Sequence, residues 1–185
     1  MTVTEAIKER RAYLSLEAVE ITEETVKQLA ESAKLACSCY NNQPWKFIFI
    51  YGRDKLEDMY STLSKGNRWA MNSSMIIAVF SKKDSDCVVK NREYYLFDTG
   101  MAVGFMLLKA TELGLVAHPI AGYKEEKVKE LLNIPEEMKI ITLIIVGKHA
   151  DDIKPELSED QALTEKERPP RKSFDEFAWI DEYKN

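Results

Sequence analysis

Cysteine and histidine are scarce in this chain, which has 3 Cys and 2 His among its 185 residues. Cys37 and Cys39 are too close in sequence for a good chelate or an easy disulfide, and so few histidines make a metal site an unattractive hypothesis. The opening segment 1–5 also lacks the basic region and apolar stretch of a secretory signal. We therefore expect reduced thiols, a cytoplasmic location and no metal site.

Long apolar runs, basic blocks and nucleotide-binding motifs are missing as well. No apolar run approaches the ~18 residues that a membrane span requires, so no membrane association is expected. The net charge is -5, and Lys and Arg occur only in short clusters beside acidic residues, which argues against nucleic acid as a partner. Neither G-x-G-x-x-G after a strand nor G-x-x-x-x-G-K-[ST] is present, so neither a Rossmann site nor a P-loop is supported.

What is present is the composition of a globular protein, with 45% hydrophobic and 10% aromatic residues. The length predicts one domain over 1–185. Beyond Gly147 the chain becomes charged and proline-containing, which indicates an extended C-terminal tail over about 150–185. Phe174, Phe177 and Trp179 return apolar character to its end, so we expect the tail to dock, and it is long enough to cross a neighbouring subunit.

Hydrophobic periodicity predicts helices alternating with strands and no internal repeat. The expected helices cover 4–11, 22–36, 54–63, 92–113 and 125–132, and the expected strands cover 47–51, 75–80, 116–119 and 140–146. Thr4 and Thr22 are the candidate caps of the first two helices. The helix 92–113 is apolar nearly all round, which predicts burial in the core or at a subunit interface, with close backbone approach at Gly100 and Gly104.

The segment Ser38-Cys39-Tyr40-Asn41-Asn42-Gln43-Pro44-Trp45 is the most informative stretch. Its Asn and Gln side chains each offer an acceptor and a donor pair, which suits a flat heterocycle with both kinds of group on its edge. Pro44 would make the loop rigid. The alternative is a plain polar helix-to-strand connection that places Trp45 in the core.

Three further segments join this loop in a pattern that resembles the nitroreductase-like FMN flavoproteins. They are Glu9-Arg10-Arg11, the run from Leu113-Gly114-Leu115 to Ala121-Gly122-Tyr123, and Arg168-Pro169-Pro170-Arg171-Lys172. The resemblance extends over about 7–172 and departs from the family at Ala12 and Leu14, where a hydroxyl and a cation are common. One hydroxyl contact and one cation near the flavin are therefore in question.

The resemblance implies a set of FMN-binding residues and no obligatory catalytic side chain. Cations would reach the phosphate and ribityl chain, polar side chains the ring, and backbone N–H groups its N5 and O4. The residues are Arg10, Arg11, Ser38, Asn41, Gln43, Asn67, Ala121, Gly122, Arg171 and Lys172. His118 could be a proton donor, although a lone His before Pro is more often structural.

The family pattern further implies an α+β fold with a central mixed β-sheet flanked by helices. It implies an intertwined homodimer whose C-terminal tails reach the partner. The expected reaction is a ping-pong transfer of hydride from NADH or NADPH through FMN to a nitroaromatic, a quinone or a similar small-molecule acceptor. The alternatives are an FMN-binding or flavin-storage protein without turnover, and a specialised member that acts on oxygen, a halogenated substrate or flavin itself.

Overall fold

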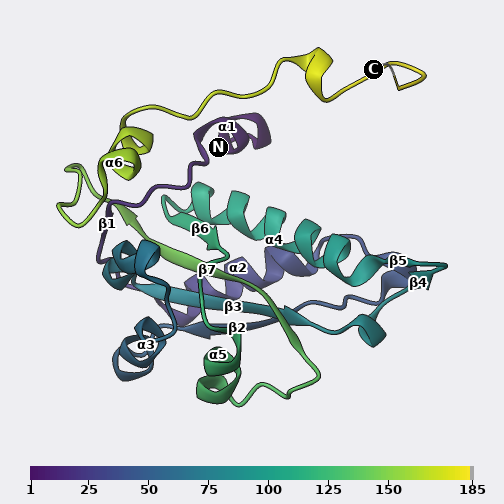
Figure 1. The fold of residues 1–185 in the computed structure, drawn as a ribbon, viewed down its shortest axis with the longest axis horizontal. Helices are drawn as coiled ribbons and strands as arrows, with labels where there is room; N and C mark the ends of the chain where they lie inside the picture. Colours follow the sequence, from purple (N-terminus) through teal and green to yellow (C-terminus); the bar gives the residue numbers. More distant parts are fainter. Residues whose placement is uncertain (184–185) are drawn as a thin grey trace.

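The computed structural model describes residues 1–183 and centres on one five-stranded sheet (Figure 1). Strand β7 pairs with β3 along one edge, and β2 pairs with β3. Strand β6 and, near the end of β7, the short β1 also pair with β7. The strands are β1 (Leu16–Glu17), β2 (Lys46–Ile50), β3 (Met75–Ser81), β6 (Val116–Ile120) and β7 (Lys139–His149).

All strand pairs in this sheet are antiparallel among residues 1–183, which corrects the expected mixed sheet. The α+β class with helices around a sheet is confirmed. The registers Ile50↔Ile76 and Ile120↔Leu143 show why the strands alternate in direction. The connections from β2 to β3 and from β6 to β7 re-enter the sheet at the end where the preceding strand left it, whereas the connection from β3 through α4 to β6 crosses to the opposite end.

Helices cover both faces of the sheet, and the alternation of side chains along β3 divides the core between them. The face of Met75, Ile77 and Val79 packs with α2 (Glu23–Lys34) and α4 (Tyr94–Glu112). The opposite face of Ile76, Ala78 and Phe80 packs with α3 (Arg53–Tyr60) and α5 (Glu125–Leu132). The strand predicted over 75–80 is confirmed as β3, and every one of its residues is buried.

One of the two predicted helix caps is confirmed, and the other is corrected by two residues. Thr22 caps α2 as predicted, its side chain accepting from Thr25 N. The first helix, α1 (Val3–Glu9), is capped by Thr2 rather than Thr4, because Thr2 and Glu5 form a capping box. It packs against α4.

The predicted close approach at Gly100 and Gly104 is wrong within residues 1–183, since a Cβ at either would meet no heavy atom within 4 Å.

The remaining elements are short. They are η1 (Cys39–Asn41), η2 (Lys65–Asn72), η3 (Lys83–Ser85), the hairpin of β4 (Val88–Val89) and β5 (Arg92–Glu93), α6 (Glu159–Lys166) and η4 (Phe174–Glu176). Helix α6 lies within the predicted tail and docks near β1, whereas the segment after it projects away from the body (Figure 1). Phe174, Phe177 and Ile180 stay exposed there.

Candidate functional site

The polar loop between α2 and β2 has an unusual backbone. Tyr40, Asn41 and Gln43 have φ angles of 48°, 59° and 50°, in the left-handed region that non-glycine residues rarely adopt. Gln43 N donates to Ser38 Oγ at 2.9 Å, and Gln43 Nε2 donates to Asn41 O at 3.2 Å. The structure thus brings the three predicted loop residues together. Pro44 is buried, and its carbonyl accepts from Ser81 Oγ at 2.8 Å.

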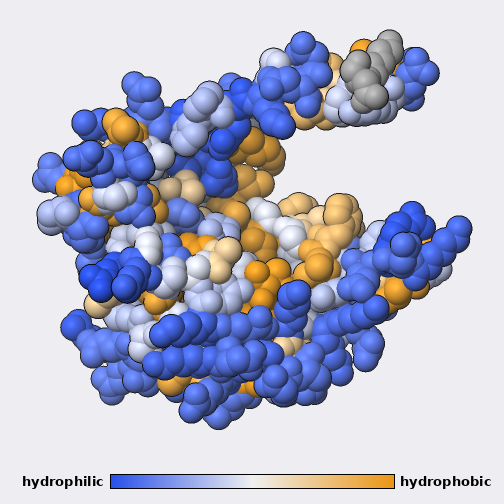
Figure 2. Space-filling model, viewed as in Figure 1, coloured by the Kyte–Doolittle hydropathy of each residue, from blue (hydrophilic) through white to orange (hydrophobic). Residues whose placement is uncertain are grey.

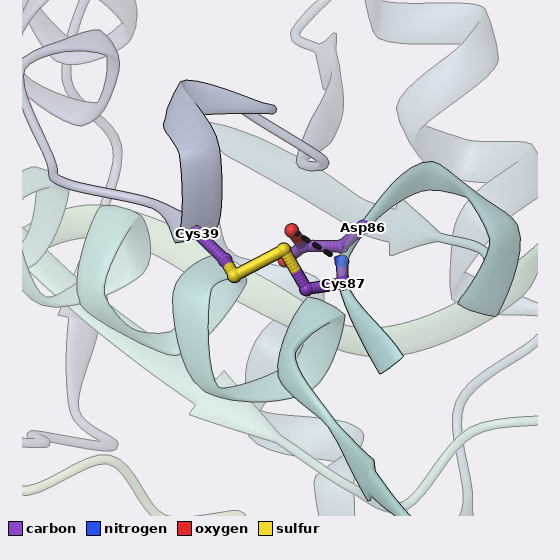
Figure 3. Close-up of side chains that lie close together, drawn as sticks. All are labelled: Cys39, Asp86 and Cys87. Carbon is purple, nitrogen blue, oxygen red and sulfur yellow. Dashed lines mark hydrogen bonds between the residues drawn. A yellow bond between two sulfur atoms is a disulfide. The ribbon is translucent and has the colours of Figure 1, made fainter. Parts of the chain in front are cut away.

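A disulfide joins this loop to the segment before β4, which corrects the expectation of reduced thiols. Cys39 and Cys87 are bonded with Cα atoms 6.1 Å apart, and Cys37 is free and exposed (Figure 3). The expectation weighed only the neighbouring Cys37 and Cys39. Cys87 lies 48 residues further along the chain, and only the fold brings it to Cys39. In the described residues, Cys39, Asp86 and Cys87 are also the one group with metal-ligand spacing, but the disulfide occupies both sulfurs.

The side chain of Asp98 in α4 anchors the start of the loop by a hydrogen bond. It is 2% exposed, and its Oδ2 accepts from Cys39 N at 2.6 Å. Burial raises the pKa of Asp98, and the neighbouring Asp86 raises it further by hydrogen bonding and charge, against the opposing effect of the Cys39 N–H. Asp86 in turn accepts from Asn42 Nδ2 at 3.2 Å. Sequence reasoning missed Asp98, because an acidic residue in an apolar helix gives no indication of its distant partner.

The turn after β6 contains the second predicted group, Ala121 and Gly122. Gly122 O accepts from Asn67 Nδ2 at 2.9 Å and from Ser64 N at 3.0 Å. A Cβ at Gly122 would meet Ser64 Oγ at 2.4 Å and Asn67 Nδ2 at 2.6 Å, so the space beside this glycine is already filled. Asn67 and Gly122 are therefore brought together, with Asn67 holding the turn. Ala121 is exposed beside them.

Arg10, Arg168 and Arg171 form the third group, which joins the two ends of the chain. Burial lowers the pKa of Arg10, and the positive charges of Arg168 and Arg171 lower it further. Arg168 Nη2 donates to Arg10 O at 3.0 Å and also to Lys8 O, which ties the tail to the end of α1. None of the three guanidinium groups forms an ion pair with a carboxylate of residues 1–183. The structure adds Arg168 to the predicted Arg10 and Arg171.

Arg11 points elsewhere than Arg10, toward the C-terminal end of α6. Its Nη2 donates to Thr164 O at 2.7 Å and to Glu165 O at 3.2 Å, and its guanidinium lies 4.5 Å from the centre of the Tyr13 ring. These contacts satisfy carbonyls at a helix end. Lys172 is exposed on the projecting segment.

The structure shows the surroundings of Ala12 and Leu14, the two positions that depart from the family pattern. Leu14 is 8% exposed and belongs to the core on the α3 and α5 side of the sheet, while Ala12 is exposed. Glu165 of α6, 7% exposed, accepts from Leu14 N at 2.6 Å and from Ser15 N at 3.2 Å. A cation at position 14 would therefore have to enter the core. Glu165 is a second buried anchor that the sequence did not reveal.

His118 has the environment of a structural residue. Its Nδ1 lies 3.1 Å from Tyr13 O, and its ring lies 4.7 Å from that of Trp69. Burial lowers the pKa of His118; the Tyr13 carbonyl raises it, Arg10 lowers it and Glu165 raises it. With a carbonyl as its partner, Nδ1 carries the hydrogen of a neutral imidazole. These contacts account for His118 without a role in proton transfer.

Comparison with known proteins agrees with this fold. The family model for the nitroreductase family matches residues 62–148. A protein of Methanothermobacter thermautotrophicus named "Putative NADH dehydrogenase/NAD(P)H nitroreductase" is 29% identical over 157 residues, covering 82% of this chain and 80% of that protein. The crystal structure of a nitroreductase family protein from Clostridium novyi NT is 28% identical with a TM-score of 0.76, covering 82% of this chain and 87% of the other.

A further solved structure shares the fold at lower identity. It is that of a protein from Exiguobacterium sibiricum in complex with FMN, 21% identical with a TM-score of 0.81, covering 98% of each chain. None of the described helices is both long and apolar enough to cross a membrane. In sequence over part of its length and in fold, the chain is thus similar to proteins of the nitroreductase family.

Proposed function

We propose that this protein is an FMN-dependent oxidoreductase that passes hydride from NADH or NADPH to a nitroaromatic, a quinone or a similar acceptor. Relatives named as NAD(P)H nitroreductases and a fold shared with an FMN complex support this proposal. When bound, FMN supplies the redox-active ring, and the two substrates take turns at it in a ping-pong sequence. The protein's part is to bind and orient that ring.

The observation that carries the proposal is the cluster of Arg10, Arg168 and Arg171. Like charges repel, and here they gather around a partly buried Arg10 without a carboxylate among residues 1–183 to compensate them. An anion with several oxygens would relieve this repulsion, and guanidinium groups bind phosphate oxygens in a fork geometry. We assign the FMN phosphate to this cluster, with Lys172 as an outer cation.

The remaining predicted residues fit the polar and planar parts of the cofactor. Ser38, Asn41 and Gln43 would present acceptors and donors to the ring edge, and Asn67 would hold the Ala121–Gly122 backbone so that its N–H groups face the ring. A glycine at position 122 fits this role, because no side chain could be added without moving Asn67. Arg11 would act indirectly, by fixing α6 and thereby the segment that carries Arg168 and Arg171.

We further propose that the chain is a single domain that works as a homodimer. Figure 2 shows hydrophobic residues gathered in the concave region between the projecting C-terminal segment and α4. Val3, Ile7, Leu35 and Phe105 are exposed by 46–77%, more apolar surface than a monomer usually leaves open. A second copy in this region would cover it, and the tail aromatics would reach the partner.

The first experiment is the absorption spectrum of the purified protein, followed by anaerobic addition of NADH or NADPH. A flavin spectrum that bleaches supports the proposal. Bound FMN that neither nucleotide reduces would contradict turnover and favour a flavin-storage protein, and absence of FMN binding would refute both.

Arginine variants test the phosphate assignment. Arg10→Ala and Arg171→Ala should each weaken FMN binding by about ten-fold or more, because a charge-assisted hydrogen bond contributes about 1.5–3 kcal/mol. Arg53→Ala is the matched control, since Arg53 is exposed on α3 and pairs only with Glu57. Equal FMN affinity in all three variants would refute the assignment.

A further inference from the structure

The loop from Ser38 to Trp45 is held in its conformation by contacts that come from outside it. Three of its residues have left-handed φ angles, which cost free energy and persist only where surrounding contacts enforce them. The contacts from outside are the Cys39–Cys87 disulfide, the Asp98 carboxylate on Cys39 N, the Asn42 side chain on Asp86 and, at the end of the loop, the Ser81 hydroxyl on Pro44 O. Figure 3 shows the disulfide between Cys39 and Cys87 with the Asp86 side chain next to it.

Of these contacts, only the disulfide can be made and broken by chemistry under mild conditions. It links two segments 48 residues apart, so its loss leaves the loop joined to the segment before β4 by the Asn42 side chain and no longer by a covalent bond. The hydrogen bonds from Asn42 are made by an exposed side chain and cannot replace a covalent link. The covalent part of the link between the loop and this segment therefore depends on the oxidation state of the two sulfurs.

We propose that Cys39 and Cys87 are a redox-active pair, whose disulfide holds the polar loop in its ligand-binding conformation and whose reduction by a thiol compound releases it. This regulation rests on the proposed function, because it acts through the loop assigned to the flavin ring. The structural half of the proposal, that the loop loosens on reduction, does not depend on FMN.

The surroundings of the two sulfurs indicate the direction of attack. Cys39 lines a surface pocket of about 430 Å³ together with Cys37, Phe97 and Met101, and Cys87 is not part of that lining. A thiolate entering the pocket would bond to Cys39 Sγ, and the Cys87 sulfur would leave with the electron pair. Asn42 Nδ2, 3.5 Å from Cys87 Sγ, is placed to donate to that leaving thiolate.

The reaction is then completed by the second thiol of a dithiol reductant. It displaces Cys39 from the mixed disulfide, so that the reductant ends as a disulfide and both cysteines end as thiols after uptake of two protons. Two electrons pass from the reductant to the protein. Any disulfide-containing oxidant reverses the exchange.

Cys37 provides a control within the same pocket. It is exposed and free, with its Sγ 3.6 Å from Met101 Sδ. It lies two residues from Cys39 but forms no covalent bond to another segment of the chain. Cys37→Ser should therefore remove a thiol and leave the redox response of the loop unchanged.

The first test measures amide hydrogen exchange of the FMN-free protein over 38–45 and 86–93, before and after treatment with dithiothreitol. We expect faster exchange after reduction, recovery on reoxidation, and the same behaviour in Cys37→Ser. Cys39→Ser and Cys87→Ser should exchange fast without reductant. Equal exchange in the two states, three free thiols in the air-oxidised protein, or Zn²⁺ retained by the reduced protein through Cys39, Asp86 and Cys87 would overturn the proposal.

The second test measures the Kd of FMN for the oxidised and the reduced protein. If the reduced loop adopts its binding conformation about one-tenth of the time, FMN should bind roughly ten-fold more weakly. The same Kd in both states would overturn the regulation while leaving the flavin assignment intact. A protein that binds no FMN in either state would refute the proposed function, and the exchange measurement would still decide whether the disulfide holds the loop.

Discussion

Glu165 and Asp98 are both buried carboxylates that accept backbone N–H groups, yet their surroundings differ. Glu165 accepts from Leu14 and Ser15, and His149 Nε2 lies 3.5 Å from it. Within residues 1–183, Asp98 accepts from Cys39 N alone and lies beside another acid, Asp86, whose buried Oδ2 has no donor there. Glu165 thus has two N–H donors and an imidazole near it, whereas the region around Asp98 favours a proton shared between two acids.

This difference separates a rigid region from an adjustable one. Around Glu165, the chain just after α1 is fixed to α6, with Arg11 and Arg168 adding contacts to helix-end carbonyls. Around Asp98, the start of the polar loop is held by the N–H bond from Cys39 and by the disulfide, next to a carboxyl group whose pKa is raised. The phosphate-binding side of the proposed site therefore belongs to the stable part of the fold, and the ring-binding loop to the part that conditions can change.

The largest expected effect comes from Glu165→Ala. It leaves the N–H groups of Leu14 and Ser15 buried without an acceptor, which should lower the free energy of unfolding by about 3 kcal/mol. Urea unfolding measures it. Glu159→Ala, an exposed site on the same helix, is the control and should change stability little. Similar losses in the two variants would show that Glu165 is no anchor.

Asp98→Ala should have the next largest effect, because Cys39 N loses its acceptor. We expect a loss of about 2 kcal/mol, and a much smaller loss in Asp98→Asn, whose amide can both accept from Cys39 N and donate to Asp86. Urea unfolding of the oxidised proteins gives the comparison. If Asn is as harmful as Ala, the carboxylate charge rather than a shared proton matters at this position.

The raised pKa of Asp98 also predicts a pH dependence. The folded state binds the proton more tightly than the unfolded state, so this contribution is present below the unfolded pKa of about 3.9 and is lost as pH rises through the folded pKa. The stability difference between wild type and Asp98→Asn should therefore shift in favour of the variant as pH rises over that window. A difference that stays constant with pH would contradict the prediction.

Gly122→Ala should cost about 1 kcal/mol, through displacement of Asn67 and loss of its hydrogen bond to Gly122 O. Gly66→Ala is the matched control, because a Cβ there would meet no heavy atom within 4 Å. Thermal unfolding of the two variants compares them. A Gly122→Ala protein as stable as the Gly66→Ala protein would show that the turn is less tightly held than its contacts indicate.

His118 should have the smallest effect on stability, and the pH dependence of its contribution has the opposite sign to that of Asp98. Its pKa is lowered in the folded state, so protonation favours unfolding, and stability should fall as pH drops below the unfolded value of about 6.5. His118→Gln should flatten this part of the pH profile. NMR titration of the His118 ring checks it directly, and a pKa at or above the unfolded value would remove the predicted slope.

Local patterns predicted much of the scaffold. The apolar run of β3 and the cap at Thr22 were recognisable because both depend on residues close in sequence. The residues of the polar loop also lie together as the motif indicated. Asp98 and Glu165 were missed, since their partners lie 59 and 151 residues away and leave no periodic signal. Helix α6 was missed because its charged sequence resembles a solvated tail.

The sequence by itself determined which segments become helices and strands, which faces are apolar, and which polar residues are available to hold a ligand. These properties follow from spacing within a few residues, where side chains of one segment share a face. Only the tertiary structure decided that Cys39 bonds to Cys87, that Arg168 binds the Arg10 carbonyl, and that Asp98 accepts a hydrogen bond from the polar loop. Such contacts form between distant segments, and their geometry exists only once the sheet and its two helical layers have packed.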